Sequence, residues 1–338
     1  MAPDQSCTIG TDRIVAALRR PNAYRGRTLS VEAIETHMSW VFKTDQHAFK
    51  LKKPLRTPYF DHRSLDARHR NTVAEIRLNR RFAAGVYLDA VPVTYDSREG
   101  IKVDGAGEVV DWLVKMRRLD ESRMLDRSIT TGTWSALDVR AVATLLSSYY
   151  GAAAPIKVEP AAYVARLRTE IEDISHALDT RQHGVSLLSV YTTCKRLRES
   201  LQRNRLALER RAGARRIVDG HGDLRPEHIC LETDPVIIDC LEFDDALRIL
   251  DPIDDLGFLA LECERLGAPE AGNLVLATYR SESNDDFPEA LLDFYQAFRA
   301  AVRAKLAAAH LREARFKDSV KWRSRTIEYL DLACRRLE

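Results

Sequence analysis

Short runs of alternating apolar and polar residues fill the first third of the chain, after one brief helical pattern at 14–18. Two of these runs flank the polar turn Thr44-Asp45-Gln46, which predicts a β-hairpin. Two more runs follow a long helical stretch and predict two further strands. The expected strands are 40–43, 47–52, 90–95 and 109–116.

The helical stretch between these strands has apolar residues at spacings of three and four. Ser64 is a suitable N-cap, and Gly85 marks the expected end of the helix. Glu75 lies on this helix, and we expect it on the same face as the apolar residues Val73 and Ile76.

Beyond residue 118 the pattern becomes mainly helical, with one compact mixed region at 217–251. Two short apolar runs in that region, around Thr233-Asp234-Pro235, predict a second hairpin. The sequence therefore predicts an α+β protein with a small N-terminal lobe over 1–118 and a larger, mainly helical C-terminal lobe over 119–338.

Composition narrows the class of protein. Hydrophobic residues make up 45% and charged residues 30%, as in globular proteins. The net charge of +2 gives no overall attraction for nucleic acid or an acidic membrane. Six scattered cysteines without a CxxC pair indicate reduced thiols. No membrane span or signal peptide is recognisable, so we expect a cytoplasmic protein that binds neither nucleic acid nor membrane.

The stretch 218–229 carries the strongest chemical pattern. Gly220 and Gly222 allow unusual backbone angles and flank His221, and Asp223 follows directly. Asp239 ends the second apolar run of the predicted hairpin. We expect the two carboxylates to serve one site, where one accepts a proton and the other holds a cation.

His221-Gly222-Asp223-Leu224-Arg225-Pro226-Glu227-His228 resembles the kinase catalytic loop H-R-D-L-x-x-x-N. Its glycine after the histidine is typical of aminoglycoside phosphotransferases and choline kinases, and Ile238-Asp239-Cys240 resembles the next motif of that group. The resemblance covers nearly the whole chain. It is strongest to a bacterial subgroup often fused to a P-loop kinase domain. Other recurring stretches are 48–54, 77–81, 115–119 and 241–245.

The resemblance implies a bilobal protein-kinase-like fold and the cofactors ATP and Mg²⁺. Asp223 matches the aspartate that accepts the proton of the substrate hydroxyl. Asp239 matches the aspartate that holds Mg²⁺ against the phosphates. Arg225 stands where many kinases have a lysine, and its charge could stabilise the transferring phosphoryl group.

Position 228 departs from the family pattern, which has asparagine there. The imidazole of His228 suits Mn²⁺ or Zn²⁺ better than Mg²⁺. Three alternatives stay open: one metal suffices, His228 holds a less strict metal, or another group such as Glu242 replaces it.

In the N-terminal lobe, Lys50 matches the lysine that contacts the α- and β-phosphates, with Lys52 on the same side of the strand as the alternative. Glu75 is the implied ion-pair partner. No glycine-rich phosphate loop is recognisable in the sequence, and Thr36-His37-Met38-Ser39 occupies the corresponding turn. Backbone N–H groups of this turn and the Ser39 hydroxyl could cap a phosphate. Met116 and Arg118 lie where the resemblance places the hinge between the lobes, whose backbone groups bind adenine.

Two groups bear on the acceptor. Glu242, Asp244 and Asp245 could attract an amino group or form a solvated turn. Tyr295, Arg299 and Arg303 share one helix face that could line the acceptor pocket, although these arginines could instead pair with the acidic group. His221 and Asp255 are expected to have structural roles, Asp255 as a buried anchor of the catalytic loop.

The expected function is transfer of the γ-phosphoryl group of ATP to a hydroxyl of a small molecule, such as a sugar, amino sugar, aminoglycoside or amino alcohol. A nucleotide-binding pseudokinase-like regulator is one alternative, because the glycine-rich loop is missing and His228 replaces asparagine. A protein kinase or AMP transferase is another. The chain has no GxxxxGK[ST] motif of its own, so a P-loop kinase partner is an expected functional link.

Overall fold

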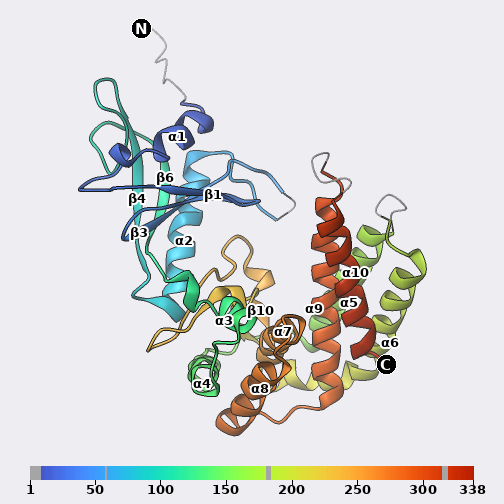
Figure 1. Cartoon of the computed structure of the whole chain (residues 1–338). Helices are drawn as coiled ribbons and strands as arrows, with labels where there is room; N and C mark the ends of the chain where they lie inside the picture. The colour runs from blue at the N-terminus through green and yellow to red at the C-terminus, as the bar shows by residue number, and fades with distance from the viewer. Residues whose placement is uncertain (1–8, 58, 180–183, 314–318) are drawn as a thin grey trace. The chain divides into compact units, whose positions relative to one another are not determined.

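The computed structural model describes residues 9–57, 59–179, 184–313 and 319–338 (Figure 1). The chain divides into two compact units. Unit 1 comprises Met1–Arg123 together with Val236–Asp245. Unit 2 comprises Met124–Pro235 and Ala246–Glu338. The short segment that carries Asp239 therefore belongs to unit 1, although the sequence pattern assigned it to the C-terminal lobe.

Unit 1 contains a six-stranded antiparallel sheet with the strand order β1-β2-β3-β6-β4-β5. The four strands expected from the sequence are present, and the hairpin around residues 44–46 is confirmed. The edge strands β1 and β5 were not predicted. The elements are α1 (Thr11–Leu18), β1 (Glu32–Glu35), β2 (Ser39–Lys43), β3 (His47–Lys52), α2 (Leu65–Ala83), β4 (Tyr87–Asp96), β5 (Gly100–Val103) and β6 (Glu108–Arg117).

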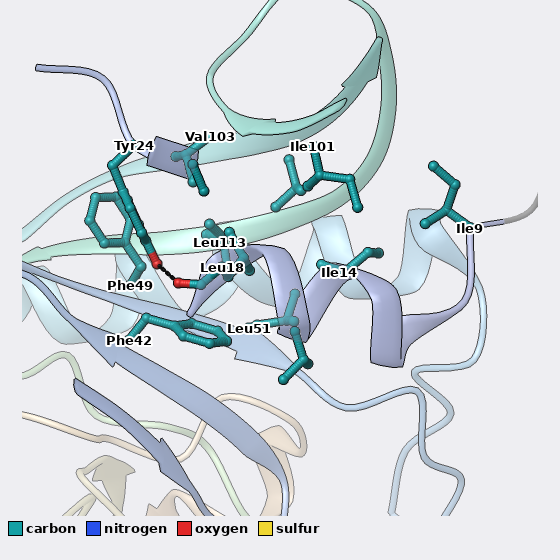
Figure 2. Close-up of a cluster of buried hydrophobic side chains, with 13 residues drawn as sticks. Ile9, Ile14, Leu18, Tyr24, Phe42, Phe49, Leu51, Ile101, Val103 and Leu113 are labelled. Carbon is teal, nitrogen blue, oxygen red and sulfur yellow. Dashed lines mark hydrogen bonds between the residues drawn. The ribbon is translucent and has the colours of Figure 1, made fainter. Parts of the chain in front are cut away.

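Alternation along β3 assigns its side chains to two different faces of the sheet. Phe49 and Leu51 join a buried apolar cluster that also includes Ile14 and Leu18 of α1 (Figure 2). Lys50 and Lys52 point to the opposite face, where both reach Glu75 of α2. The strand's period of two thus gives this sheet one apolar face and one face that carries two lysines.

Helix α2 begins where the sequence predicts, because the Ser64 side chain accepts a hydrogen bond from the Ala67 N–H at 3.2 Å. Glu75 and Ile76 are buried, as expected. The expectation for Val73 was wrong: its side chain is 46% exposed. Residues two apart on a helix point in nearly opposite directions, so Val73 and Glu75 cannot share a face.

Unit 2 is mainly helical, as expected. Helices α5, α6, α9 and α10 lie side by side, while α7 is buried along most of its length (Figure 1). The helices are α3 (Leu125–Thr131), α4 (Ala136–Ala152), α5 (Pro160–Leu178), α6 (Leu187–Gly213), α7 (Pro252–Arg265), α8 (Pro269–Ser283), α9 (Glu289–His310) and α10 (Val320–Arg336). Among the described residues, no helix combines the length and apolar character that a membrane crossing requires.

The predicted second hairpin corresponds to two very short strands, β8 (Ile229–Cys230) and β9 (Val236–Ile237). Strand β8 belongs to unit 2 and β9 to unit 1. The loop that resembles a kinase catalytic loop follows β7 (Val218–Asp219), which pairs with β10 (Ile249–Leu250). These elements confirm the expected α+β class.

Candidate active site

A buried ion-pair group in unit 1 is centred on Lys50. Its Nζ donates to Glu75 Oε1 at 2.9 Å and to Asp239 Oδ1 at 2.7 Å. Glu75 is fully buried, whereas the Asp239 side chain is 46% exposed. The structure therefore brings together the lysine, glutamate and aspartate that the sequence singled out, with the aspartate at the open end.

Lys50 and Glu75 stay charged at neutral pH. Burial lowers the pKa of Lys50, but the charges of Asp239 and Glu75 outweigh it and raise that pKa well above its ordinary value. Burial raises the pKa of Glu75, and the charges of Lys50 and Lys52 reverse this to a net lowering. A permanently cationic Lys50 is suited to binding phosphate oxygens.

The backbone at Asp239 is unusual. Its φ of 61° lies in the left-handed region, which residues other than glycine adopt rarely. Such residues are often found at functional sites. Two flanking contacts hold it: the Asp239 N–H donates to the Tyr87 hydroxyl at 3.0 Å, and the Cys240 N–H donates to Asn79 Oδ1 at 2.9 Å. Sequence reasoning missed Tyr87 and Asn79 as positioning residues, although Asn79 lies in the recurring stretch at 77–81.

Lys52 lies deeper than Lys50. Its ammonium group pairs with Glu75 and, at 2.5 Å, with Glu242. Burial raises the pKa of Glu242, and Lys52 lowers it only in part. Glu242 was grouped with Asp244 as an acceptor-binding candidate, but it is engaged with Lys52 inside unit 1.

The three other nucleotide candidates have local partners. Ser39 is buried, and its N–H donates to Thr36 Oγ1 at 3.0 Å. Met116 packs against the apolar cluster beside α2. The Arg118 guanidinium donates to the Thr44 carbonyl at 2.8 Å. Their roles toward a nucleotide stay predictions.

In unit 2, Asp255 anchors the loop at 220–225. Its carboxylate accepts hydrogen bonds from the His221 N–H at 2.7 Å and the Gly222 N–H at 3.1 Å, and from the Tyr150 hydroxyl at 2.9 Å. This confirms the structural role expected for Asp255. His221 is also structural, because its Nδ1 accepts from the Asp223 N–H at 3.3 Å.

The two glycines of the loop serve different purposes. Gly222 has a φ of 86°, so it needs the conformational freedom expected for it. Gly220 is needed for space instead: a Cβ there would lie 2.6 Å from Asp255 Oδ2 and 2.7 Å from Leu250 Cδ1.

Asp223 is surrounded by cationic groups. Arg225 Nε lies 3.1 Å from Asp223 Oδ2, and Arg303 Nη1 lies 3.8 Å from Oδ1. Burial raises the pKa of Asp223, but the positive charges around it, that of Arg225 first, prevail and lower it to about 2. The carboxylate is therefore ionised and able to accept a hydrogen bond at neutral pH.

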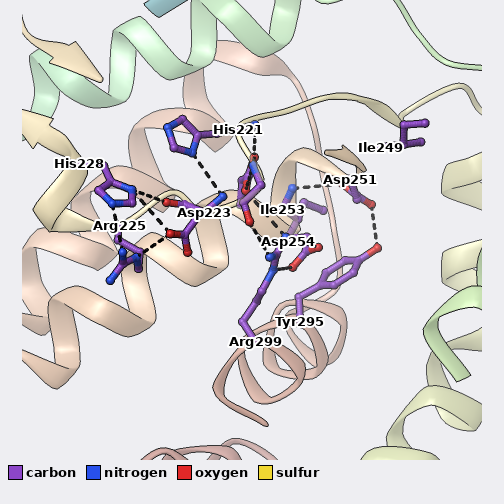
Figure 3. A network of polar contacts seen from close by, with 12 residues as sticks. His221, Asp223, Arg225, His228, Ile249, Asp251, Ile253, Asp254, Tyr295 and Arg299 are labelled. Carbon is purple, nitrogen blue, oxygen red and sulfur yellow. Dashed lines mark hydrogen bonds and ion pairs between the residues drawn. The ribbon is translucent and has the colours of Figure 1, made fainter. Parts of the chain in front are cut away.

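His228 uses both ring nitrogens within this loop (Figure 3). Its Nδ1 lies 2.8 Å from the Asp223 carbonyl oxygen, and its Nε2 lies 3.1 Å from Arg225 Nη2. A carbonyl can only accept and a guanidinium can only donate, so these contacts assign the proton to Nδ1 and a lone pair to Nε2. To bind a metal through Nε2, His228 would have to exchange Arg225 for the ion.

Two of the three residues on the α9 face, Tyr295 and Arg299, have structural partners, whereas Arg303 lies beside Asp223. Tyr295 is fully buried, and its hydroxyl contacts Tyr163 at 3.1 Å and Asp251 at 3.3 Å. Arg299 makes two hydrogen bonds to Asp254, at 2.6 and 2.9 Å, and one to the Gly222 carbonyl at 2.8 Å (Figure 3). Burial of Tyr295 speaks against contact with an acceptor, and Arg299 pairs with the start of α7, not with the acidic group at 242–245.

Comparisons with known proteins give relatives without an assigned function. No family model matches the chain. Uncharacterised proteins of Mycobacterium tuberculosis and Mycobacterium bovis are 34% identical over 287 residues, which is 82% of this chain and 54% of each relative. The chain thus spans about half the length of these curated relatives.

Solved structures with the same fold cover almost the whole chain. A choline/ethanolamine kinase family protein from Mesorhizobium loti has a TM-score of 0.55 at 14% identity, covering 97% of this chain and 94% of its own. A spectinomycin phosphotransferase in complex with ADP and spectinomycin has a TM-score of 0.54 at 11% identity, covering 96% and 98%. An aminoglycoside 2′-phosphotransferase in complex with GDP has a TM-score of 0.53 at 17% identity, covering 92% and 94%.

Proposed function

We propose that this chain, whose fold is that of the choline/ethanolamine kinases and aminoglycoside phosphotransferases, is an ATP-dependent phosphotransferase acting on a hydroxyl of a small molecule. The observation that carries the proposal is the ion-pair group of unit 1: Lys50 held between buried Glu75 and half-exposed Asp239. The acceptor is a sugar, amino sugar, aminoglycoside or amino alcohol.

Lys50 is the better candidate of the two lysines for binding the phosphates of ATP. Its partner Asp239 is half-exposed, whereas Lys52 is 2% exposed and the side chains of both of its partners, Glu75 and Glu242, are no more than 9% exposed. Glu75 orients Lys50, and the hinge around Met116 and Arg118 is proposed to contact adenine.

Asp239 is suited to a magnesium ion, because a half-exposed carboxylate is a hard oxygen donor. Bound there, the ion would neutralise charge on the phosphates. Lys50 would release Asp239 for this purpose and turn toward the phosphate oxygens. His228 stays an alternative ligand for a second ion such as Mn²⁺ only if it gives up Arg225.

Asp223 is proposed to orient the acceptor hydroxyl and to accept its proton at a carboxylate oxygen. Its lowered pKa keeps it ionised but makes it a weak base. This suits a loose transition state, in which the proton leaves late and positioning dominates. Arg225, 3.1 Å from Asp223, would add positive charge beside the transferring group.

Two substitutions test these roles separately. Asp223→Asn should lower turnover by roughly 10²–10⁴-fold and leave ATP affinity nearly unchanged, because it removes the proton acceptor alone. Asp239→Asn should abolish the Mg²⁺-dependent part of ATP binding. Calorimetric titration with ATP, with and without Mg²⁺, and an ADP-release assay over hydroxyl-bearing metabolites give both quantities. Near-normal turnover in Asp223→Asn with the true acceptor would refute the assignment.

A nucleotide-binding regulator is the second candidate. The engagement of the Ser39 N–H with Thr36 and of His228 with Arg225 favours it, because neither group is presented for phosphate or metal. In that case Mg²⁺–ATP would bind, but no hydroxyl acceptor would increase ADP release.

A further inference from the structure

Five charged side chains of unit 1 form one alternating row: Asp239, Lys50, Glu75, Lys52 and Glu242. Each ammonium group pairs with two carboxylates, and Glu75 pairs with both ammonium groups. The row is open at one end and closed at the other, since Asp239 is 46% exposed while Lys52 is 2% and Glu242 9% exposed.

The second lysine changes how firmly Lys50 is held. A buried carboxylate with a single cation binds that cation strongly, because no water competes for it. Glu75 is fully buried and divides its two oxygens between Lys50 and Lys52. With Lys52 on one oxygen, Glu75 stays neutralised even when Lys50 moves toward another anion.

Glu242 has a balancing role in the same row. Three carboxylates and two ammonium groups leave one surplus negative charge in the row. Glu242 draws Lys52 away from Glu75 and so increases the hold of Glu75 on Lys50. Glu242 therefore acts on Lys50 through Lys52, although the two glutamates lie on separate segments of the chain.

We propose that Lys52 is a positioning residue that neutralises Glu75 and Glu242, so that Lys50 can exchange Asp239 for the phosphates of a nucleotide. The inference rests on the proposed function, and it assigns Glu242 as the counter-ion of Lys52, not as an acceptor-binding or metal-binding residue.

The first test is calorimetric titration of the full chain with Mg²⁺–ATP at a temperature well below the unfolding midpoint of every variant. Lys52→Met should weaken the affinity for Mg²⁺–ATP by about tenfold or more. Without Lys52, Glu75 and Glu242 would compete with the phosphates for the ammonium group of Lys50. Lys52→Arg, which keeps the charge, should recover part of the loss. Lys43→Met is the matched control: Lys43 also lies in the sheet and pairs with a glutamate, Glu121, outside the row. The Lys43→Met variant should bind Mg²⁺–ATP with the affinity of the wild type.

Glu242→Gln is the complementary test, because it removes the counter-ion of Lys52 and not Lys52 itself. Lys52 would still have an ion-pair partner in Glu75. It should bind Mg²⁺–ATP as tightly as the wild type or up to about fivefold more tightly. If Glu242 bound the metal or the nucleotide, the same substitution would weaken binding. The double variant Lys52→Met/Glu242→Gln removes one charge of each sign and should recover most of the affinity lost in Lys52→Met.

The outcomes are distinct. A wild type that does not bind Mg²⁺–ATP would refute the proposed function and this inference with it. A wild type that binds, together with a folded Lys52→Met variant within about twofold of it, would refute the inference alone. If Lys52→Met does not fold, weaker binding by Glu242→Gln, or a folded double variant that stays about tenfold weaker than wild type, would refute it equally.

Discussion

Asp239 combines a strained backbone with a salt bridge, and neighbouring side chains sustain both. The Tyr87 hydroxyl and the Asn79 amide accept the N–H groups of residues 239 and 240. A non-glycine residue at positive φ costs on the order of 1–3 kcal/mol. Such a cost is maintained where the conformation directs a side chain to a functional position, here toward Lys50.

His62 is the residue whose titration should affect stability most visibly in unit 1. It is buried and stacks on Phe60 with ring centroids 4.1 Å apart. Burial, with the charges of Lys52 and Arg68, lowers its pKa to about 4, while Asp61 and Glu75 oppose this only in part. The folded protein therefore holds His62 neutral, whereas the unfolded chain binds a proton near pH 6.5.

The stabilising contribution of neutral His62 is thus complete above about pH 6.5 and is lost as the pH falls toward 4. We predict that the free energy of unfolding declines by up to about 1.4 kcal/mol per pH unit from this residue between pH 6.5 and 5. His62→Phe, which can keep the stacking on Phe60, should flatten that part of the profile. Thermal unfolding midpoints of both proteins across this range measure the effect, and parallel profiles would contradict it.

At the scale of elements, the loop that carries Asp223 is held by the start of α7. Asp251 caps this helix by accepting from the Ile253 N–H at 3.1 Å. In the first turn, Asp254 fixes Arg299, and Asp255 fixes two N–H groups of the loop. The position of Asp223 therefore depends on the α7 N-terminus as well as on β7, the strand that precedes the loop.

Gly220→Ala should disturb this arrangement, since a Cβ would lie within 2.7 Å of Asp255 and Leu250. We predict a loss of roughly 1–3 kcal/mol in stability and a drop in turnover that exceeds the loss of folded protein. Gly151→Ala on α4 is the matched control, because no atom lies within 4 Å of its added Cβ. Chemical denaturation and ADP release measure the two effects; a Gly220→Ala variant equal to the control would contradict the account.

The elements that the sequence predicted well are those with a clear period and a cap, such as β2, β3 and α2 with Ser64. Strand β1 was missed because Glu32–Glu35 is an edge strand with polar ends, so it has no alternating apolar face. The ion pair between Lys50 and Glu75 was predicted correctly from the order of the motifs that the chain shares with the kinase-like family. Tyr87 and Asn79 could not be found that way, because their role arises from contacts with a segment more than 150 residues further along the chain.

At the scale of the whole molecule, neither unit is a continuous stretch of sequence. The segment Val236–Asp245 belongs to unit 1 and supplies both Asp239 and Glu242 to the lysines of β3. The expected boundary after residue 118 is close to the end of the first stretch of unit 1 at Arg123. The later segment is held in unit 1 by ion pairs, by hydrogen bonds to Tyr87 and Asn79, and by apolar packing of Val236 and Ile238. These are long-range contacts, so the local pattern of apolar residues could not reveal them.

The mycobacterial relatives are about twice as long as the part that this chain matches. The functional link to a P-loop kinase domain stays a prediction. So does the acceptor, because the likeness to the solved kinases shows the fold and not the substrate.

The most direct test of phosphoryl transfer is identification of the products by ³¹P NMR. The full chain would be incubated with Mg²⁺–ATP and pools of hydroxyl-bearing small molecules, with Asp223→Asn in parallel. We predict ADP and a new phosphate monoester in equal amounts with one acceptor, both formed at least about a hundredfold more slowly by Asp223→Asn. Formation of AMP and pyrophosphate, or bound ATP that no acceptor consumes, would contradict the account.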